Sequence, residues 1–165
     1  MSNEESDRLE RLERRLGEVE DYLSILRLVA NYGPSVDSGS GRWTASLWVE
    51  DGVYDTDALV MNGRGELEAM VAAEDHQGYI HGGSAHIPSL PLITIDGDRA
   101  VAIGYSRLYL FNGKDFRVAR ASATRWELVR TDSGWRVERR IVRLLDGSSE
   151  ARDLLKEAMP SELRD

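Results

Sequence analysis

The chain has 165 residues, of which 41% are hydrophobic and 30% charged, a composition typical of one folded domain with an ordinary core. Its net charge of −8 argues against nucleic acid and anionic membrane as partners, because both require a basic surface. It has no cysteine, and the N-terminal MSNEESDRLERLERR lacks the apolar stretch of a secretion signal. We therefore expect a cytoplasmic protein without a nucleic-acid or membrane partner.

A long helical pattern opens the chain over residues 6–31. Gly17 lies inside this pattern, and two interpretations remain open. Either one amphipathic helix packs on its own sheet, or residues 1–19 form an arm that packs on a neighbouring subunit. The pattern is a heptad seam of apolar residues at alternating spacings of three and four: Leu9, Leu12, Leu16, Val19, Leu23 and Leu26.

Proline and glycine are expected to end this helix at Gly33-Pro34, since proline lacks a backbone donor and restricts the residue before it. Residues 35–41 are then a turn with Asp37 at its centre, and turn chemistry alone would account for an aspartate there. The next segments predict a short helix, a strand and a second helix over residues 42–48, 53–59 and 66–73.

Strands and tight turns dominate from residue 84 onward. Asn112-Gly113 is a strong signal for a hairpin turn between two of these strands. Helices followed by a long run of strands favour an α+β fold. Residues 148–165 are expected to form a C-terminal helical tail, which leaves 20–147 as the domain proper. The strands are predicted over residues 87–95, 100–111, 116–130 and 135–145.

All three histidines lie in Asp75–His86, with the sequence DHQGYIHGGSAH. Their five-residue spacing fits neither one helix face nor one strand face, so we expect no metal site. His86 opens a strand, where a structural role or a catalytic one is possible. We expect His76 and His81 at the surface or the rim of a pocket.

Three long segments carry a family resemblance: SILRLVANYGPSVDSGSGRWTASLWVEDGVYD, SAHIPSLPLITIDGDRAVAIGYSRLYL and TRWELVRTDSGWRVERRIVRLLDG. With the segments between them they span residues 20–147. Their order and spacing resemble the SnoaL-like group of the NTF2-like (cystatin-like) superfamily, which contains scytalone dehydratase, hexachlorocyclohexane dehydrochlorinase and bile-acid 7α-dehydratase. The resemblance implies a cone in which N-terminal helices close a curved mixed or antiparallel sheet around a pocket.

The same resemblance implies catalytic residues. The family's aspartate after the first helix falls on Asp37, and its histidine at the start of the first long strand falls on His86. The assisting arginine of the dehydrochlorinase is best matched by Arg139, which strand alternation places with Trp135. A salt bridge at the sheet rim would explain Arg139 equally well. Ser106 stands where scytalone dehydratase has a second histidine.

These matches imply a cofactor-independent lyase or isomerase in which His86, oriented by Asp37, removes a carbon-bound proton from a small apolar cyclic or polycyclic substrate. An epoxide hydrolase or polyketide cyclase, or a non-catalytic binding module, are the alternatives. The leucine seam, together with the open sheet face that the resemblance implies, favours a homo-oligomer, either a dimer or a trimer. Residues expected to line the pocket are Tyr32, Trp48, Tyr54, His81, Tyr105, Ser106, Leu108 and Trp126.

Overall fold

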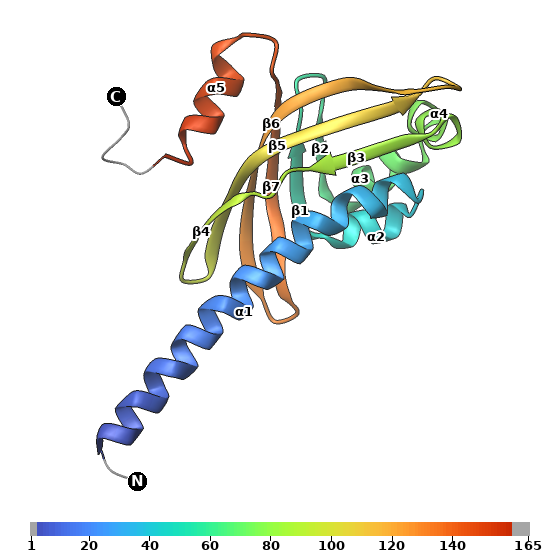
Figure 1. Cartoon of the computed structure of the whole chain (residues 1–165). Helices are drawn as coiled ribbons and strands as arrows, with labels where there is room; N and C mark the ends of the chain where they lie inside the picture. Colours follow the sequence, from blue (N-terminus) through green and yellow to red (C-terminus); the bar gives the residue numbers. More distant parts are fainter. Residues whose placement is uncertain (1–2, 160–165) are drawn as a thin grey trace.

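The computed structural model describes residues 3–159. It consists of a curved seven-stranded sheet with most of its helices on the inner face (Figure 1). The helices are α1 (Asn3–Asp37), α2 (Gly41–Ser46), α3 (Gly63–Ala72), α4 (Glu74–Gly82) and α5 (Ser149–Lys156). The expected α+β class and the cone-like arrangement are confirmed.

The strands pair in the order β2-β1-β7-β6-β5-β3, with β4 also paired to β5. All neighbours are antiparallel except β1 and β7, which are parallel, so the sheet is mixed. The segment expected as one strand over 87–95 is two strands, separated at Ser89-Leu90-Pro91, because proline cannot donate to a ladder. The strands are β1 (Trp48–Asp55), β2 (Val60–Asn62), β3 (Ser84–Pro88), β4 (Leu92–Asp96), β5 (Arg99–Phe111), β6 (Phe116–Thr131) and β7 (Gly134–Leu144).

Helix α1 does not end at Gly33-Pro34, in contrast to the sequence prediction. Proline removes only one helical donor, and the helical bonds resume directly, with Ser38 N–H donating to the Pro34 carbonyl at 3.1 Å. The Ser35 hydroxyl also donates to the Tyr32 carbonyl at 2.8 Å. Asp37 is therefore the last residue of a helix rather than the centre of a loop, and its position is fixed by α1.

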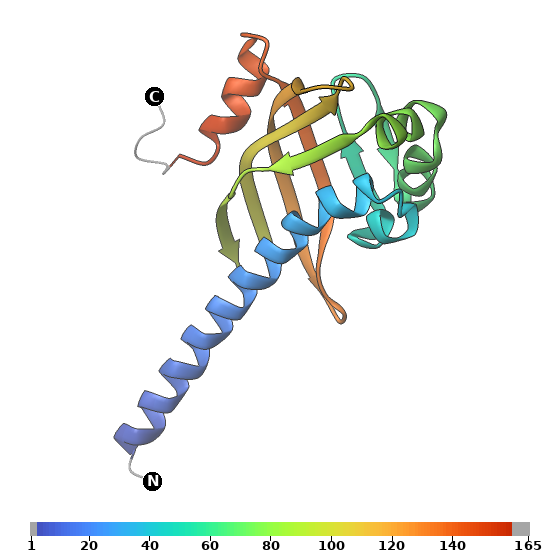
Figure 2. The same cartoon turned by 45° about the vertical axis from the view of Figure 1, so that its right-hand side comes forward.

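The core lies between α1 and the inner face of the sheet, whereas α5 covers part of the outer face through Ala151 and Leu154 against Ala123. Helix α1 is continuous through Gly17, and its N-terminal half extends well away from the sheet (Figures 1 and 2). Among the described residues no helix is long and apolar enough to cross a membrane. The inner core residues include Ile25, Val29, Tyr32, Trp48, Trp126, Leu128 and Val137.

One irregularity in β7 decides which side chains enter the cone. Glu127 of β6 is opposite Arg139, but the next residue, Leu128, is opposite Val137. Glu138 is thus the extra residue of a β-bulge, and a bulge shifts the alternation of inward and outward side chains by one position. Beyond the bulge the buried residues of β7 are Arg140 and Val142.

Candidate functional site

Asp37 and His86 meet where the C-terminal end of α1 crosses β3. The Asp37 Oδ1 atom lies 2.7 Å from His86 Nδ1, and Oδ2 accepts the backbone N–H of His86 at 2.7 Å. The Ser84 hydroxyl donates to Oδ1 at 2.9 Å. Two positions that the sequence places 49 residues apart therefore form one hydrogen-bonded unit.

This unit fixes the protonation of the imidazole. An ionised carboxylate only accepts hydrogen bonds, so Nδ1 of His86 carries the proton and Nε2 is the basic nitrogen. Burial raises the pKa of Asp37, but the hydrogen bonds from the His86 side chain and backbone, with Ser84, outweigh it and hold the pKa below its usual value. Asp37 stays ionised at neutral pH.

His76 of α4 is a second histidine of the site, although the sequence predicted it at the surface or the rim. It is buried, and its ring stacks on that of His86 with centroids 5.6 Å apart. Burial, and then the proximity of His86, lower the pKa of His76, while Val36 and Asp37 oppose the effect. The prediction missed His76 because residues 74–82 carry no clear helical pattern, so the helix that aims this ring inward was not anticipated.

A buried arginine, Arg140, occupies the centre of the cone. Its side chain is enclosed by aromatic rings, with the guanidinium carbon 3.9 Å from the ring centre of Tyr32, 4.1 Å from that of Trp126 and 4.8 Å from that of Tyr54. The residue is only 1% exposed. Stacking on aromatic faces stabilises a desolvated guanidinium, and here it replaces water on its faces.

Hydrogen bonds to Arg140 are few for a buried cation. Nε donates to the Thr124 hydroxyl at 3.4 Å and Nη2 to the Ser106 hydroxyl at 3.3 Å. Nη1 has no partner, nor does Nε1 of neighbouring Trp126, and no described carboxylate forms an ion pair with Arg140. A buried cation without a counter-charge lowers the stability of the fold, so its presence here points to a function that requires it.

Arg139, the arginine predicted for the site, lies on the other face of β7. It pairs with Asp55 at 2.6 Å, and Arg143 binds the same carboxylate at 2.8 Å. The prediction assumed unbroken alternation along the strand, and the bulge at Glu138 reverses it. The correct inward arginine is Arg140, one position further along.

A cavity of about 70 Å³ connects the two halves of the site. His86 and Arg140 both line it, so the imidazole of one and the guanidinium of the other border one small space. Its lining is more polar than the apolar wall expected from the sequence. The lining residues are Tyr54, His86, Ser106, Leu108, Arg120, Ser122, Arg140 and Val142.

Other residues predicted to line the pocket fall into three groups. Tyr54, Ser106 and Leu108 line it as expected. Tyr32 and Trp126 lie behind it, against Arg140, and Trp48 is fully buried in the core beside them. Two predictions are wrong: Tyr105 is an exposed residue of the outer sheet face, and His81 is exposed on the last turn of α4.

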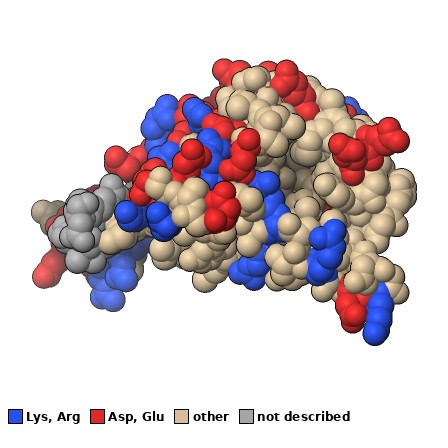
Figure 3. All heavy atoms as spheres, turned by 90° about the horizontal axis from the view of Figure 1, so that it is seen from above, with Lys and Arg blue, Asp and Glu red and all other residues tan. Residues whose placement is uncertain are grey.

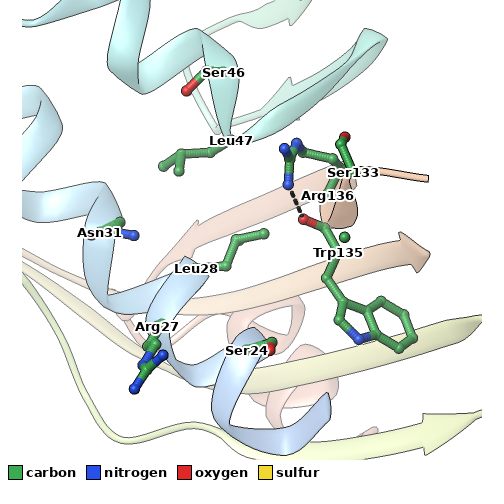
Figure 4. A pocket seen from close by; sticks show the side chains of 10 residues that line it. Ser24, Arg27, Leu28, Asn31, Ser46, Leu47, Ser133, Trp135 and Arg136 are labelled. Carbon is green, nitrogen blue, oxygen red and sulfur yellow. Dashed lines mark hydrogen bonds between the residues drawn. The ribbon is translucent and has the colours of Figure 1, made fainter. Parts of the chain in front are cut away.

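A larger hollow, about 340 Å³, lies elsewhere, between α1, the end of α2 and the β6–β7 turn (Figure 4). Arg136 from its wall donates to the Trp135 carbonyl at 2.7 Å. Arg27 and Arg136 are its ionisable side chains, so it lacks a base of histidine or carboxylate type. We therefore assign the site to the smaller cavity, where the acid–base pair lies.

The face in Figure 3 carries interspersed acidic and basic side chains over one part and, over the rest, a broad uncharged area with a few charged side chains at its rim. Within residues 3–159, no three His, Cys, Asp or Glu side chains are grouped as metal ligands would be.

Helices that close a curved mixed sheet, with a hydrogen-bonded Asp–His pair and a buried arginine inside, define a cone-shaped α+β protein with an internal polar site. The sequence profile of the SnoaL-like domain matches residues 17–141, and the chain belongs to this family. The resemblance noted from the sequence is thereby confirmed.

Solved structures agree with this assignment. An NTF2-like protein with a cystatin-like fold from Novosphingobium aromaticivorans is 38% identical, with a TM-score of 0.87, over 89% of this chain and 96% of that chain. A variant of Rv3472, a function-unknown protein from Mycobacterium tuberculosis, is 21% identical, with a TM-score of 0.70, over 93% and 83%. A protein from Catenulispora acidiphila in complex with S-DNPA is 21% identical, with a TM-score of 0.66, over 74% and 92%. No curated protein sequence matches the chain.

Proposed function

We propose that this protein is a cofactor-independent lyase or isomerase that removes a proton from a carbon next to a carbonyl group. The observation that carries the proposal is the pairing of two groups on one cavity: His86, whose Nδ1 is held by Asp37, and Arg140, whose Nη1 has no partner. Base and cation are the two groups that enolate formation requires.

His86 acts first in this scheme. Its Nε2 takes the proton from carbon, and the electron pair of the broken C–H bond moves into the developing enolate. Asp37 keeps Nδ1 protonated and stabilises the imidazolium that results, as a carboxylate at 2.7 Å does in a weakly screened site. The three hydrogen bonds that Asp37 accepts keep it from rotating during this step.

Arg140 receives the negative charge. The enolate oxygen would accept a hydrogen bond from Nη1, which is preorganised by the rings of Tyr32 and Trp126 rather than by another anion. A donor fixed in advance in a dry site stabilises a transition-state charge without reorganisation. Nη1 is buried and no described protein group accepts a hydrogen bond from it, so a substrate oxygen that reaches it as the cavity opens would supply the missing acceptor.

The second half of the reaction can follow two courses. In a dehydration the electron pair of the enolate forms the new double bond and expels a β-hydroxyl group. The imidazolium protonates this leaving group to give water. In an isomerisation the imidazolium returns its proton to the γ-carbon of a dienolate. With about 70 Å³ of enclosed space, the cavity holds the reacting end of a substrate, and a cyclic remainder would lie toward Arg120 and Leu108.

A non-catalytic binding module is the second candidate. Ser106, which stands where scytalone dehydratase has a second histidine, bonds Arg140 instead of handling a proton, which favours binding of an anion. A hydrolase is less well supported, because none of the side chains lining the cavity is a carboxylate to pair with Asp37 in activating water.

The proposal is tested by hydrogen exchange and turnover. Small β-hydroxy cyclic ketones and β,γ-unsaturated cyclic ketones are incubated with the protein in heavy water, and NMR follows deuterium at the α-carbon together with any product. We expect exchange with wild type and at least about a hundredfold less with His86→Gln. His81→Gln, on an exposed turn, serves as the matched control and should retain full exchange.

A parallel binding measurement separates the two candidates. The absorbance of 4-nitrophenolate, a planar enolate mimic, reports its binding in the cavity. Binding that requires Arg140, without exchange of any ketone, would favour the binding module over the enzyme. Binding that survives Arg140→Met would remove the role assigned to this cation.

A further inference from the structure

The N-terminal half of α1 exposes an apolar stripe that its own domain does not cover. These residues project beyond the sheet in two views that differ by 45° (Figures 1 and 2). An isolated helical segment of this length is marginally stable in water, so an uncovered apolar stripe along it calls for a partner. The exposed fractions along the stripe are Leu9 46%, Leu12 51%, Leu16 58%, Val19 55% and Leu23 44%.

Contacts at the domain end fix the rotation of α1 and turn this stripe outward. Asp21 binds Arg130 at 2.6 and 2.7 Å and accepts the indole N–H of Trp135 at 2.9 Å. Ile25 and Leu28, one and two turns further, are buried against the domain. Asp21 occupies the f position of the heptad set by Leu9 at a, which is the position opposite the a/d seam. The seam therefore faces away from its own sheet.

The charges beside the seam select one type of partner. With Leu9 at a, the charged g positions are Arg8 and Arg15, and the charged e positions are Glu13, Glu20 and, at the domain end, Arg27. In a parallel coiled coil each g residue meets the partner's e residue five positions later, so Arg8 meets the partner's Glu13 and Arg15 meets the partner's Glu20. In an antiparallel pair g positions meet g positions and e positions meet e positions, so Arg8 and Arg15 would have no glutamate opposite them.

We infer that α1 forms a parallel two-stranded coiled coil with α1 of a second copy of this chain. Along Leu9–Val19 the apolar stripe is only two positions wide, because the flanking e and g positions there are charged, and a narrow a/d stripe suits two strands. Gly17 lies at an outward b position, where a Cβ would have no atom within 4 Å. It therefore does not interrupt the seam. Both domains then lie at the same end of the coil.

The absence of cysteine from the chain allows a direct test of orientation. Leu9→Cys in the full-length protein places one thiol near the far end of the seam. We expect mild oxidation to give a covalent dimer, because residues at the same a level adjoin in a parallel coil. Arg14→Cys, at an outward f position, is the matched control and should stay reduced. A cross-link between Leu9→Cys and Leu23→Cys chains, without Leu9 self-linking, would indicate an antiparallel pair and overturn the inference.

Charge reversal tests the partner itself. Glu13→Arg with Glu20→Arg makes the four e and g residues at positions 8, 13, 15 and 20 all basic, and Arg8→Glu with Arg15→Glu makes the same four acidic. Each variant alone should raise the dimer dissociation constant at least about tenfold, measured by sedimentation equilibrium, and an equimolar mixture should restore a mass of two chains. Wild-type monomer, a wild-type mass of three chains, or variants that keep the wild-type mass would each overturn the inference. The unfolding temperature of the sheet domain should be the same in all variants, which separates loss of pairing from loss of folding.

Discussion

Gly33 of α1 lies directly against the backbone carbonyl of His86 in β3. A Cβ at position 33 would be 2.1 Å from that carbonyl oxygen, closer than any side chain permits. The helix and the strand thus approach each other more closely than with any other residue at this position. Asp37, one turn further along α1, thereby reaches both the backbone N–H and the imidazole of His86.

Gly33→Ala should therefore disrupt both folding and the site. The methyl group must push β3 away from α1, and we expect the free energy of unfolding to fall by about 1–3 kcal/mol, or more. The matched control is Gly17→Ala on the same helix, where nothing lies within 4 Å. There alanine should raise helix stability by roughly 1 kcal/mol. Urea denaturation of both variants measures the difference, and equal effects would contradict the role assigned to Gly33.

The activity of the site should depend strongly on the charge of Asp37 and much less on any single hydrogen bond that Asp37 accepts from Ser84. In Asp37→Asn an amide group must face the His86 backbone N–H or imidazole N–H, so one buried donor is left unpaired, at a cost of about 1–3 kcal/mol in unfolding free energy. The imidazole also loses the group that selects its tautomer, and carbon–hydrogen exchange should fall at least about a hundredfold.

Ser84→Ala is the graded comparison for Asp37→Asn. It removes one of three hydrogen bonds to the carboxylate and leaves both bonds to His86. We expect a loss of about 1 kcal/mol in unfolding free energy and less than a tenfold loss of exchange. If Ser84→Ala were as inactive as Asp37→Asn, orientation by the hydroxyl rather than the carboxylate charge would control the site.

Arg140 and its neighbour Arg139 should respond in opposite ways to the same substitution. Arg140→Met removes a buried cation that has no carboxylate partner, so unfolding free energy should stay within about 1 kcal/mol of wild type or rise. Carbon–hydrogen exchange and binding of 4-nitrophenolate should both be lost. A residue that can be removed without a loss of stability but not without a loss of activity is one retained for function.

Arg139→Met is the matched control on the outer face. It breaks the ion pair with Asp55, whose carboxylate keeps Arg143, and the arginine side chain is 45% exposed. The loss of unfolding free energy should therefore be about 1 kcal/mol or less, with exchange unchanged. Loss of exchange in Arg139→Met with full exchange in Arg140→Met would restore the assignment made from the sequence.

The sequence was sufficient for the Asp37–His86 pair because helix and strand order and a family pattern specify both positions. It was insufficient for Arg140 because one bulged residue, Glu138, changes which side chains of β7 point inward. No local sequence pattern predicts such a bulge. Pro34 was misleading for a related reason. A proline removes one helical bond, but whether the helix continues depends on tertiary contacts such as the Thr44 and Ser35 hydroxyls, 3.1 Å apart.

His76 provides a pH-dependent test of the site. Burial, with the proximity of His86, holds its pKa below the ordinary value of 6.5, so the unfolded chain binds a proton more readily than the folded one. Its contribution to stability is full above about pH 6.5 and is lost as the pH falls through that value toward the folded pKa. Asp37, also with a lowered pKa, loses its contribution only when the pH falls below its ordinary value of 3.8, so the two effects occupy separate pH ranges.

The urea midpoint of wild type should therefore decrease as the pH is lowered from about 7.5 to about 5.5. The midpoint of His76→Phe should decrease less over the same interval. Phenylalanine keeps the stacked ring against His86 but cannot be protonated, and it also removes the unpaired Nε2 atom of His76. His81→Phe, on the exposed turn of the same helix, is the control and should follow wild type. A His76→Phe variant with the full wild-type pH dependence would show that another group is responsible for the acid sensitivity.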